Sequence, residues 1–323
     1  VNNHADLLRA SIASAGNDHR LGANEAPPAI LSIFIGSQLT QVLDDLEQRL
    51  NGKALTPDEK SELKLNIGKI PEILLDNTDR NRTSPFAFTG NKFEFRAVGS
   101  TANCATPMIA LNAAMAQQLK VFKKEVDALI AGGKKKDEAI LEVLRNTIKA
   151  SRKILFEGNG YGDAWVKEAE KRGLSNVKTA PHALDFYIKE SSLKLFEELG
   201  IMSKREQEAR YEIYQENYRM KIQIESRVMA DMAFNHIIPA AIKYQSTLVE
   251  NITGLKTIYG DDYKKFASGQ LQILEELSSR ITRVREEALA MIEARKVANE
   301  LESQPEQAKA YCETVVPYFE KIR

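Results

Sequence analysis

The chain has 323 residues, with 45 lysines and arginines balanced by 45 aspartates and glutamates, which is enough length for two ordinary domains or one long one. The zero net charge argues against a general nucleic-acid or anionic-membrane binder. Only two cysteines occur, Cys104 and Cys312, and they form no CxxC motif, so we expect neither a disulfide scaffold nor a zinc ribbon but a cytoplasmic protein. No apolar run is long enough to span a bilayer and no signal peptide opens the chain, so no membrane partner is expected.

The N-terminal part predicts helices that flank one buried strand. Residues 3–15 read as a helix that stops at Gly16-Asn17. A turn-rich loop, NDHRLGANEAPPA, follows, and the apolar segment 28–36 predicts a strand. Apolar residues then recur every three or four positions over 39–50, which predicts an amphipathic helix. Thr56-Pro57-Asp58-Glu59 has the form of a capping box, so a further helix is predicted to begin there.

The segment NRTSPFAFTGNKFEFR, residues 81–96, predicts two short antiparallel strands. Apolar and polar residues alternate on both sides of a turn at Thr89-Gly90-Asn91. Phe93 and Phe95 share one face of the second strand, because side chains alternate between the two faces. The opposite face therefore carries a row of charges: Lys92, Glu94 and Arg96.

From residue 104 onward the pattern is almost entirely helical. Helices are predicted over 107–133, 137–158, 164–171 and 183–199, then from Ser203, from Gly269 and from Ser303. The helix from Ser203 must be kinked or interrupted at Pro239. The helix after Gly269 carries a coiled-coil-like seam: Leu274, Leu277, Ile281, Val284, Ala288 and Met291. This seam predicts either an intramolecular bundle or a contact between subunits.

The lone carboxylate in the charged row suits phosphoryl transfer. Such a reaction needs a divalent metal and several cations around the moving negative charge. Glu94 is therefore a candidate metal ligand, and Arg82, Lys92 and Arg96 are candidates to neutralise phosphate or a substrate carboxylate. A solvated strand face with alternating charges gives the same pattern, and the spacing does not separate the two interpretations.

Longer stretches around this row resemble the glutamine synthetases. Residues 81–96, followed by AVGSTANCATPMIALNAAMA, resemble the family pattern in which an NRS segment precedes a strand reading I/F-E-x-R-x and an SAN-type turn leads into a helix. Upstream, NDHRLGANEAP resembles the family's RL…EAP loop. The departures from the usual motif sequences and the long helical C-terminal part resemble the type III enzymes of bacteria. The resemblance is specific over residues 1–125, and the helical remainder is similar in overall character.

The resemblance implies an α+β fold that is predominantly α. Residues 1–125 would be the C-terminal portion of the catalytic domain, with a few antiparallel strands, and residues 126–323 would form a helical assembly domain. It also implies a ring-shaped homo-oligomer, with a dodecamer as the expected form. The family's other metal-binding glutamates and its ammonia site lie upstream of the part that this chain resembles. We therefore expect the chain to be part of a longer enzyme and to be inactive alone.

The resemblance also assigns catalytic and metal-binding roles. Arg82, in the NRS-like position, matches an arginine that binds ATP and stabilises the transferring phosphate. Glu25, in EAP, matches a flap glutamate that shields the intermediate and helps to deprotonate bound ammonium. Glu94 matches a glutamate that binds the metal, Mg²⁺ or Mn²⁺.

Three further positions are matched to substrates, and one departs from the family pattern. Arg96 and Arg20 match arginines that hold substrate glutamate, although the loop RLGANEAP is one residue shorter than usual. Lys92 falls where the family has an arginine for the ATP phosphates, so the charge is kept but the planar fork is lost. Ala87 stands where the family commonly has a further arginine.

The implied reaction is the ATP-dependent ligation of ammonia to the γ-carboxylate of L-glutamate through a γ-glutamyl phosphate. Glutamate, ammonium and ATP are then the expected partners. Two alternatives stay open. The chain could be a helical homo-oligomerisation module with a vestigial site, or part of a related glutamate–amine ligase, since the amine pocket lies outside the resembling residues.

Overall fold

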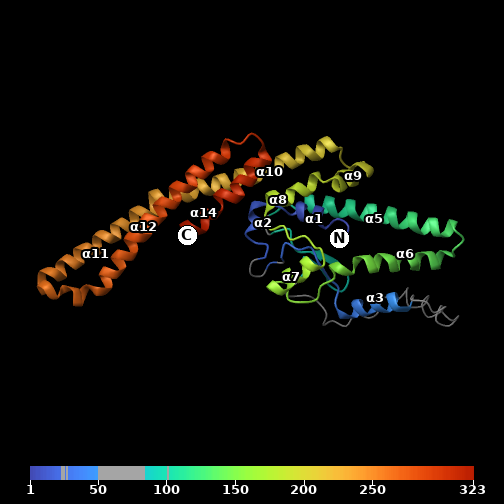
Figure 1. The fold of residues 1–323 in the computed structure, drawn as a ribbon, viewed down its shortest axis with the longest axis horizontal. Helices are drawn as coiled ribbons and strands as arrows, with labels where there is room; N and C mark the ends of the chain where they lie inside the picture. The colour runs from blue at the N-terminus through green and yellow to red at the C-terminus, as the bar shows by residue number, and fades with distance from the viewer. Residues whose placement is uncertain (23–25, 27, 50–83, 100–101) are drawn as a thin grey trace. The chain divides into compact units, whose positions relative to one another are not determined.

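The computed structural model divides into two compact units, residues 1–211 and residues 212–323, each described by itself (Figure 1). It describes residues 1–22, 26, 28–49, 84–99 and 102–323. The described chain is predominantly helical with a small sheet, which confirms the predicted fold class. The helix predicted from Thr56 lies outside the described residues. Across the described ranges, no helix is long and apolar enough to cross a membrane.

The first unit contains a small sheet surrounded by helices. Its elements are α1 (Ala5–Ser11), α2 (Ala15–Asp18), β1 (Ile33–Phe34), α3 (Ser37–Arg49), β2 (Phe86–Phe88), β3 (Phe93–Phe95), α5 (Ala105–Ala131), α6 (Lys136–Ser151), η1 (Arg152–Ile154), α7 (Asp163–Lys171), α8 (Ala180–Leu184), η2 (Asp185–Ile188) and α9 (Glu190–Glu198). The amphipathic helix predicted over 39–50 is confirmed as α3, and the helix predicted over 164–171 is confirmed as α7.

The sheet has the order β1-β2-β3 and is mixed. β2 and β3 are antiparallel as predicted, but β1 runs parallel to β2. The strand predicted over 28–36 forms only at Ile33–Phe34, and the Ser32 carbonyl before it accepts from the Phe86 N–H over 3.3 Å. Ile30 packs against Trp165 and Ala169 of α7.

Aromatic pairs fix the register of β2 and β3. The rings of Phe86 and Phe95 stack with their centroids 4.4 Å apart, and those of Phe88 and Phe93 lie 5.2 Å apart. Between the strands, the Thr89 N–H donates to the Lys92 carbonyl over 2.9 Å. Such cross-strand pairs stabilise a short hairpin, so the register and orientation of β3 are set by its contacts with β2.

The N-terminal helix is shorter than predicted. α1 ends at Ser11, and Gly16 and Asn17, which were predicted to stop the helix, lie inside the next helix, α2. The Ser14 side chain caps α2 by accepting from the Asn17 N–H over 3.2 Å. A serine cap favours a new helix start at this point, and the sequence analysis did not recognise it.

Helices α5 and α6 form an antiparallel pair (Figure 1). α5 ends before Gly132-Gly133 as predicted, and Gly133 has a φ of 92°, which favours glycine. α6 stops at Ser151, earlier than the predicted 158, because the chain leaves the helix to join the sheet. The Phe156 N–H donates to the Ile33 carbonyl over 3.0 Å.

The single helix predicted over 183–199 is wrong. The chain forms α8, the 3₁₀ turn η2 and α9 in succession, and the extended backbone of Lys189 (φ −60°, ψ 144°) separates the last two. The Ser192 hydroxyl donates to the Phe186 carbonyl over 2.7 Å, which satisfies an acceptor that a continuous helix would have used.

The second unit is entirely helical in its described secondary structure. A long helix, α10 (Lys204–Asp231), runs into it from the end of the first unit. The elements that follow are η3 (Met232–Ile237), α11 (Ile238–Tyr259), η4 (Gly260–Asp262), α12 (Tyr263–Asn299), α13 (Gln304–Ala310), η5 (Tyr311–Val315) and α14 (Pro317–Ile322). The predicted interruption near Pro239 takes the form of a π-helical segment, η3, which accommodates the proline without a break.

The seam of α12 lies within a two-helix hairpin. α11 and α12 pack against each other along their length (Figure 1). Ala288 and Met291 of the seam are fully buried, and the Gln245 amide of α11 donates to the Ser278 hydroxyl of α12 over 2.7 Å. Of the two interpretations left open by the sequence, these contacts favour the intramolecular bundle.

We therefore expect Ile281→Asp to destabilise the second unit without changing the oligomeric mass. A carboxylate at this half-buried position would lose its hydration, at a cost of about 1–3 kcal/mol. Chemical unfolding and native mass measurement test this together. Thr282→Asp places the same charge on the exposed neighbouring residue and should change neither the unfolding transition nor the mass. A reduced mass with unchanged unfolding would place the seam between subunits.

The capping box at the start of α10 is confirmed. The Ser203 N–H and hydroxyl both donate to Glu206 Oε2, over 2.7 and 2.8 Å, and the Glu206 N–H donates to Ser203 Oγ over 3.4 Å. The backbone hydrogen bond from Ser203, with the hydroxyl second, lowers the pKa of the Glu206 carboxyl. At pH values above the ordinary pKa of glutamate, the cap therefore stabilises α10 fully. This stabilisation is lost as the pH falls through the lowered pKa of Glu206.

An NMR titration of Glu206 is expected to give a pKa below that of an unperturbed glutamate. Ser203→Ala should raise this pKa part of the way back, because it removes the hydroxyl donor and keeps the backbone donor. Ser246→Ala, a serine in the middle of α11, is the matched control and should leave Glu206 unchanged. An identical Glu206 pKa in Ser203→Ala would mean that the hydroxyl does not stabilise the carboxylate.

Candidate functional site

The predicted row of charges is formed on β3. Glu94 Oε1 lies 3.5 Å from Lys92 Nζ, and Glu94 Oε2 lies 3.2 Å from Arg96 Nε. The side chains are 63% exposed at Lys92, 39% at Glu94 and 18% at Arg96. The row thus runs from solvent toward the body of the first unit, with the carboxylate held between the two cations.

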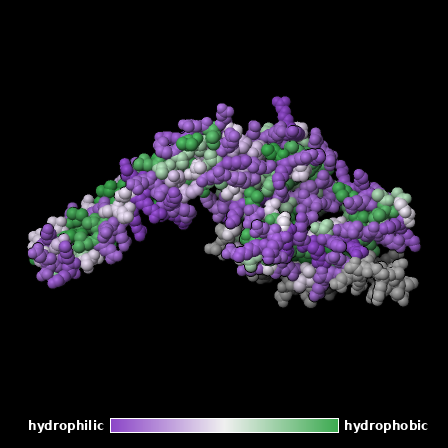
Figure 2. Space-filling view, in the orientation of Figure 1, coloured by the Kyte–Doolittle hydropathy of each residue, from purple (hydrophilic) through white to green (hydrophobic). Residues whose placement is uncertain are grey.

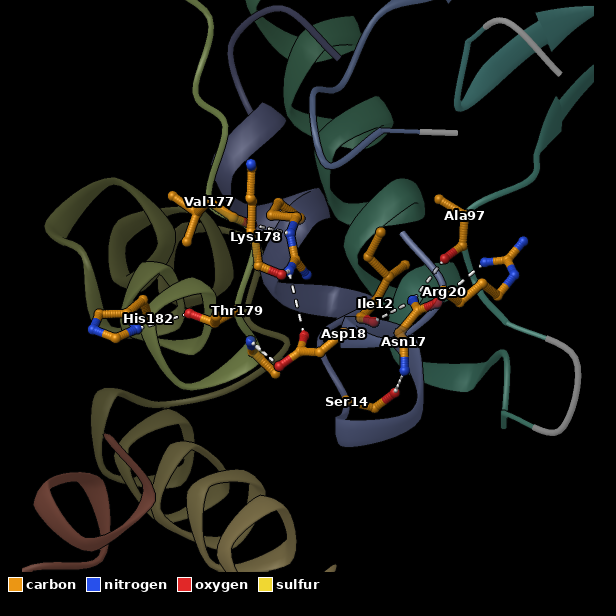
Figure 3. Close-up of polar contacts among 12 residues, drawn as sticks. Ile12, Ser14, Asn17, Asp18, Arg20, Ala97, Val177, Lys178, Thr179 and His182 are labelled. Carbon is orange, nitrogen blue, oxygen red and sulfur yellow. Dashed lines mark hydrogen bonds and ion pairs between the residues drawn. The ribbon is translucent and has the colours of Figure 1, made fainter. Parts of the chain in front are cut away.

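Arg20 joins this row from a distant part of the sequence. Its Nη2 donates to the Arg96 carbonyl over 2.9 Å. Its Nη1 donates to Asn17 Oδ1 over 3.1 Å (Figure 3). The structure therefore brings together Arg20, Lys92, Glu94 and Arg96. The other two predicted site residues, Glu25 and Arg82, lie outside the described residues.

The contact from Arg20 argues against the interpretation of the row as a purely solvated strand face. A purely solvated face needs no contact from another element. Here a second arginine bonds to the main chain of the row, and Arg96 is largely buried. A guanidinium group and a lysine beside one carboxylate, with a second guanidinium group on the main chain of the row, form a cationic site that suits an anionic ligand.

The donor set at the row fits part of a metal site. Mg²⁺ prefers oxygen ligands, keeps several waters and is often held by one or two carboxylates together with substrate phosphates. Glu94 supplies one partly exposed carboxylate of this kind. In the part of the chain that the structure describes, no three His, Cys, Asp or Glu residues are grouped to hold a metal ion. Glu94 can therefore contribute a single ligand.

Ala87 lies opposite Glu94 across the β2–β3 pair and is fully buried. Cross-strand partners share a face of the sheet, so the stem of Glu94 stands beside a small apolar side chain. The charge that the family resemblance would place at this position is absent from it.

Asn17, which the sequence analysis interpreted only as a helix stop, contacts this site from within. Its side chain is 2% exposed, and its Nδ2 donates to the carbonyls of Ile12 and Ala97, each over 2.8 Å (Figure 3). Its Oδ1 accepts from Arg20. The signal in the sequence was available, since an asparagine beside a tight turn commonly bonds main-chain groups.

The sequence analysis also missed a buried ion pair behind α2. Arg9 is 2% exposed, and it donates from Nε to the Val177 carbonyl over 2.8 Å and from Nη2 to the Lys178 carbonyl over 3.0 Å. Its Nη2 lies 3.8 Å from Asp18 Oδ1, and Asp18 Oδ2 accepts from the Ala180 N–H over 2.8 Å (Figure 3). Burial lowers the pKa of the Arg9 guanidinium, and the Asp18 charge opposes this effect.

Known proteins resemble the chain along its whole length. It is 53% identical over 324 residues to a glutamine synthetase of Bacteroides fragilis (strain YCH46), and the match covers 100% of this chain. In its sequence, the chain is thus similar to glutamine synthetases. It is also 38% identical to a glutamine synthetase of Butyrivibrio fibrisolvens and 34% identical to the type-3 glutamine synthetase of Dictyostelium discoideum, again over 100% of this chain.

The chain spans less than half of each of these glutamine synthetases: 44%, 45% and 44% of their lengths. In addition, residues 139–256 match the family model described as the glutamine synthetase C-terminal domain. This range begins in α6 and ends in α11, so the row on β3 lies outside it. The predicted resemblance to glutamine synthetase, including its type III form, is confirmed.

Proposed function

We propose that the protein containing this chain is an ATP-dependent glutamate–ammonia ligase, a glutamine synthetase. One observation carries this proposal: Glu94 lies between Lys92 and Arg96, while Arg20 bonds to the main chain of Arg96. A carboxylate surrounded by cations suits a reaction in which a phosphoryl group moves between oxygens. The names of the relatives support the same chemistry.

The proposed roles divide the row between substrate and nucleotide. Arg20 and Arg96 would bind the carboxylates of glutamate, since a guanidinium grips a carboxylate with two parallel hydrogen bonds. Lys92, the most exposed member, would contact the ATP phosphates. Glu94 would be one ligand of a Mg²⁺ or Mn²⁺ ion, which when bound withdraws negative charge from the phosphate oxygens. Arg82 and Glu25 keep the roles that the family resemblance gives them.

The reaction would proceed in two displacements. A γ-carboxylate oxygen of glutamate attacks the terminal phosphorus of ATP, and the bond to ADP breaks. Arg82 would stabilise the charge on the phosphoryl oxygens, and Lys92 would hold the phosphates in place. Ammonium loses a proton with help from Glu25, ammonia attacks the acyl carbon, and the C–O bond to phosphate breaks. Each step develops negative charge on oxygen, which suits the cations of the row.

The family resemblance also carries proposals for the whole protein. It would be a cytoplasmic, ring-forming homo-oligomer, with a dodecamer as the expected form. Residues 1–125 would belong to its catalytic domain, and residues 126–323 to a helical assembly domain. In this form the remaining metal ligands and the ammonia site would come from sequence that the chain does not contain, so the chain by itself would be inactive.

Phosphate release from ATP tests the proposed function. The protein that contains this chain is incubated with ATP and excess Mg²⁺, with and without glutamate and ammonium. Release that needs both substrates, together with formation of glutamine, is the expected result. Phosphate release with glutamate and another amine, but not with glutamate and ammonium, would instead identify a related glutamate–amine ligase. The residues of the row do not define the amine pocket, so they are compatible with both enzymes.

A helical homo-oligomerisation module with a vestigial site is the second candidate. The observation in its favour is the number of apolar side chains that the second unit exposes, such as Ile224, Val228 and Ile258 at 57%, 52% and 73%. Apolar patches lie among the hydrophilic side chains of this unit (Figure 2). Under this alternative, the protein would assemble normally and release no phosphate with any combination of substrates.

A further inference from the structure

A single buried carboxamide connects Arg20 to the main chain next to Arg96. Asn17 uses both of its N–H groups and its carbonyl oxygen: it donates to Ile12 and Ala97 and accepts from Arg20. A buried amide with all of its hydrogen bonds formed is held in one orientation, because rotation would leave polar groups unpaired. Asn17 is therefore a fixed point for the groups that it contacts.

Asn17 contacts Arg20 directly and contacts the main chain next to Arg96. Arg20 donates to Asn17 Oδ1 and also to the Arg96 carbonyl, while Asn17 donates to the carbonyl of Ala97, the next residue. These bonds close a ring that joins Asn17, Arg20 and the main chain at 96–97. The guanidinium of Arg20 and the backbone from which the Arg96 side chain projects are thus held relative to each other.

The chain after β3 also turns directly over Asn17. Gly99 has a φ of +101°, a conformation that side chains other than glycine rarely adopt. A Cβ built on Gly99 would lie 3.6 Å from Asn17 Oδ1. The backbone at 97–99 therefore wraps around the carboxamide, an arrangement separate from the hydrogen bonds to Arg20.

We infer that Asn17 is a positioning residue, which presets Arg20 and Arg96 as a pair for the carboxylates of substrate glutamate. This inference rests on the proposed function. A ligand that carries two carboxylates gains most from two guanidinium groups whose separation is fixed before binding, because their ordering then costs no additional entropy. Side chains that orient metal ligands change affinity or activity about 10- to 100-fold when they are removed, and we expect a comparable change where a side chain orients substrate-binding arginines.

The test is steady-state kinetics of Asn17→Ala in the native protein that contains this chain. The KM for glutamate is expected to rise about tenfold or more. The KM for ATP should stay within about twofold, because Lys92 is not part of the ring. Ser14→Ala is the matched control: it removes the cap of the same short helix, α2, and leaves the carboxamide contacts in place.

A second variant covers the case in which Asn17→Ala does not fold. Asn17→Asp keeps the size and the acceptor for Arg20 but replaces both N–H donors, so it should also raise the KM for glutamate selectively. Failure of both variants to fold would make Asn17 a folding residue and overturn the inference. A KM for glutamate equal to that of the unmodified protein would overturn it as well. So would equal increases of the KM for glutamate and the KM for ATP.

The outcome also separates this inference from the proposed function. If the unmodified protein shows no glutamate-dependent phosphate release, the proposed function fails and the role of Asn17 fails with it. If the unmodified protein is active and Asn17→Ala behaves like Ser14→Ala, only the positioning role is wrong.

Discussion

Glu94→Gln is expected to reduce turnover by glutamate, ammonium and ATP on the order of 100-fold or more in the protein that contains this chain. The amide has the size of the carboxylate but no negative charge, so it would bind a divalent cation poorly. Folding should be nearly unaffected. The side chain is 39% exposed, and ion pairs at such positions contribute about 0–1 kcal/mol.

Glu142→Gln provides the matched control for this experiment. Glu142 is 43% exposed and pairs with Lys134, so the substitution removes a similar ion pair at a similar depth, far along the chain from the row. Turnover should be unchanged in that variant. Raising the Mg²⁺ or Mn²⁺ concentration should recover part of the activity of Glu94→Gln. Full activity of Glu94→Gln at ordinary metal concentrations would remove Glu94 from the metal site.

Arg9→Met is expected to lower the free energy of unfolding of the first unit by about 3–5 kcal/mol. Methionine fills a similar volume, so the loss comes from the charge and its hydrogen bonds. The carbonyls of Val177 and Lys178 lose their donor, and the carboxylate of Asp18 loses its nearby cation in a buried place. Removing one partner of a buried pair costs far more than removing one at the surface.

Lys189→Met is the surface comparison for Arg9. Lys189 Nζ lies 2.8 Å from Asp6 Oδ2, and the side chains are 49% and 33% exposed. Its loss should cost no more than about 1 kcal/mol. Denaturant unfolding followed by circular dichroism measures both variants. Equal midpoints for Arg9→Met and the unmodified protein would mean that the buried pair does not hold α1 to the segment at 177–178.

The charged row was predictable from sequence because it depends on local rules alone. Alternation along β3 places Glu94 between its two cations, and the turn after Phe88 follows from residues next to each other in the chain. The same holds for the caps at Ser203 and Ser303, where the relevant partners lie three residues apart.

What the sequence did not reveal depends on contacts between distant residues. Asn17 bonds to Ala97, and Arg9 bonds to Val177, so neither role has a local signal beyond the residue type. The division of residues 183–199 into three elements likewise depends on how this segment packs against α1. Periodicity describes the faces of one element, and it does not determine which other elements will contact them.

The hairpin of α11 and α12 has a consequence for how the protein can vary in length. Its two helices contact each other and are joined at Gly260–Asp262, a turn with no buried residue, while α12 also contacts η5 and α14. Whole helical turns added to both arms at this tip would extend the pair without disturbing the residues packed at its base. This turn is thus a place where insertions and deletions would leave the packing around Met291 unchanged.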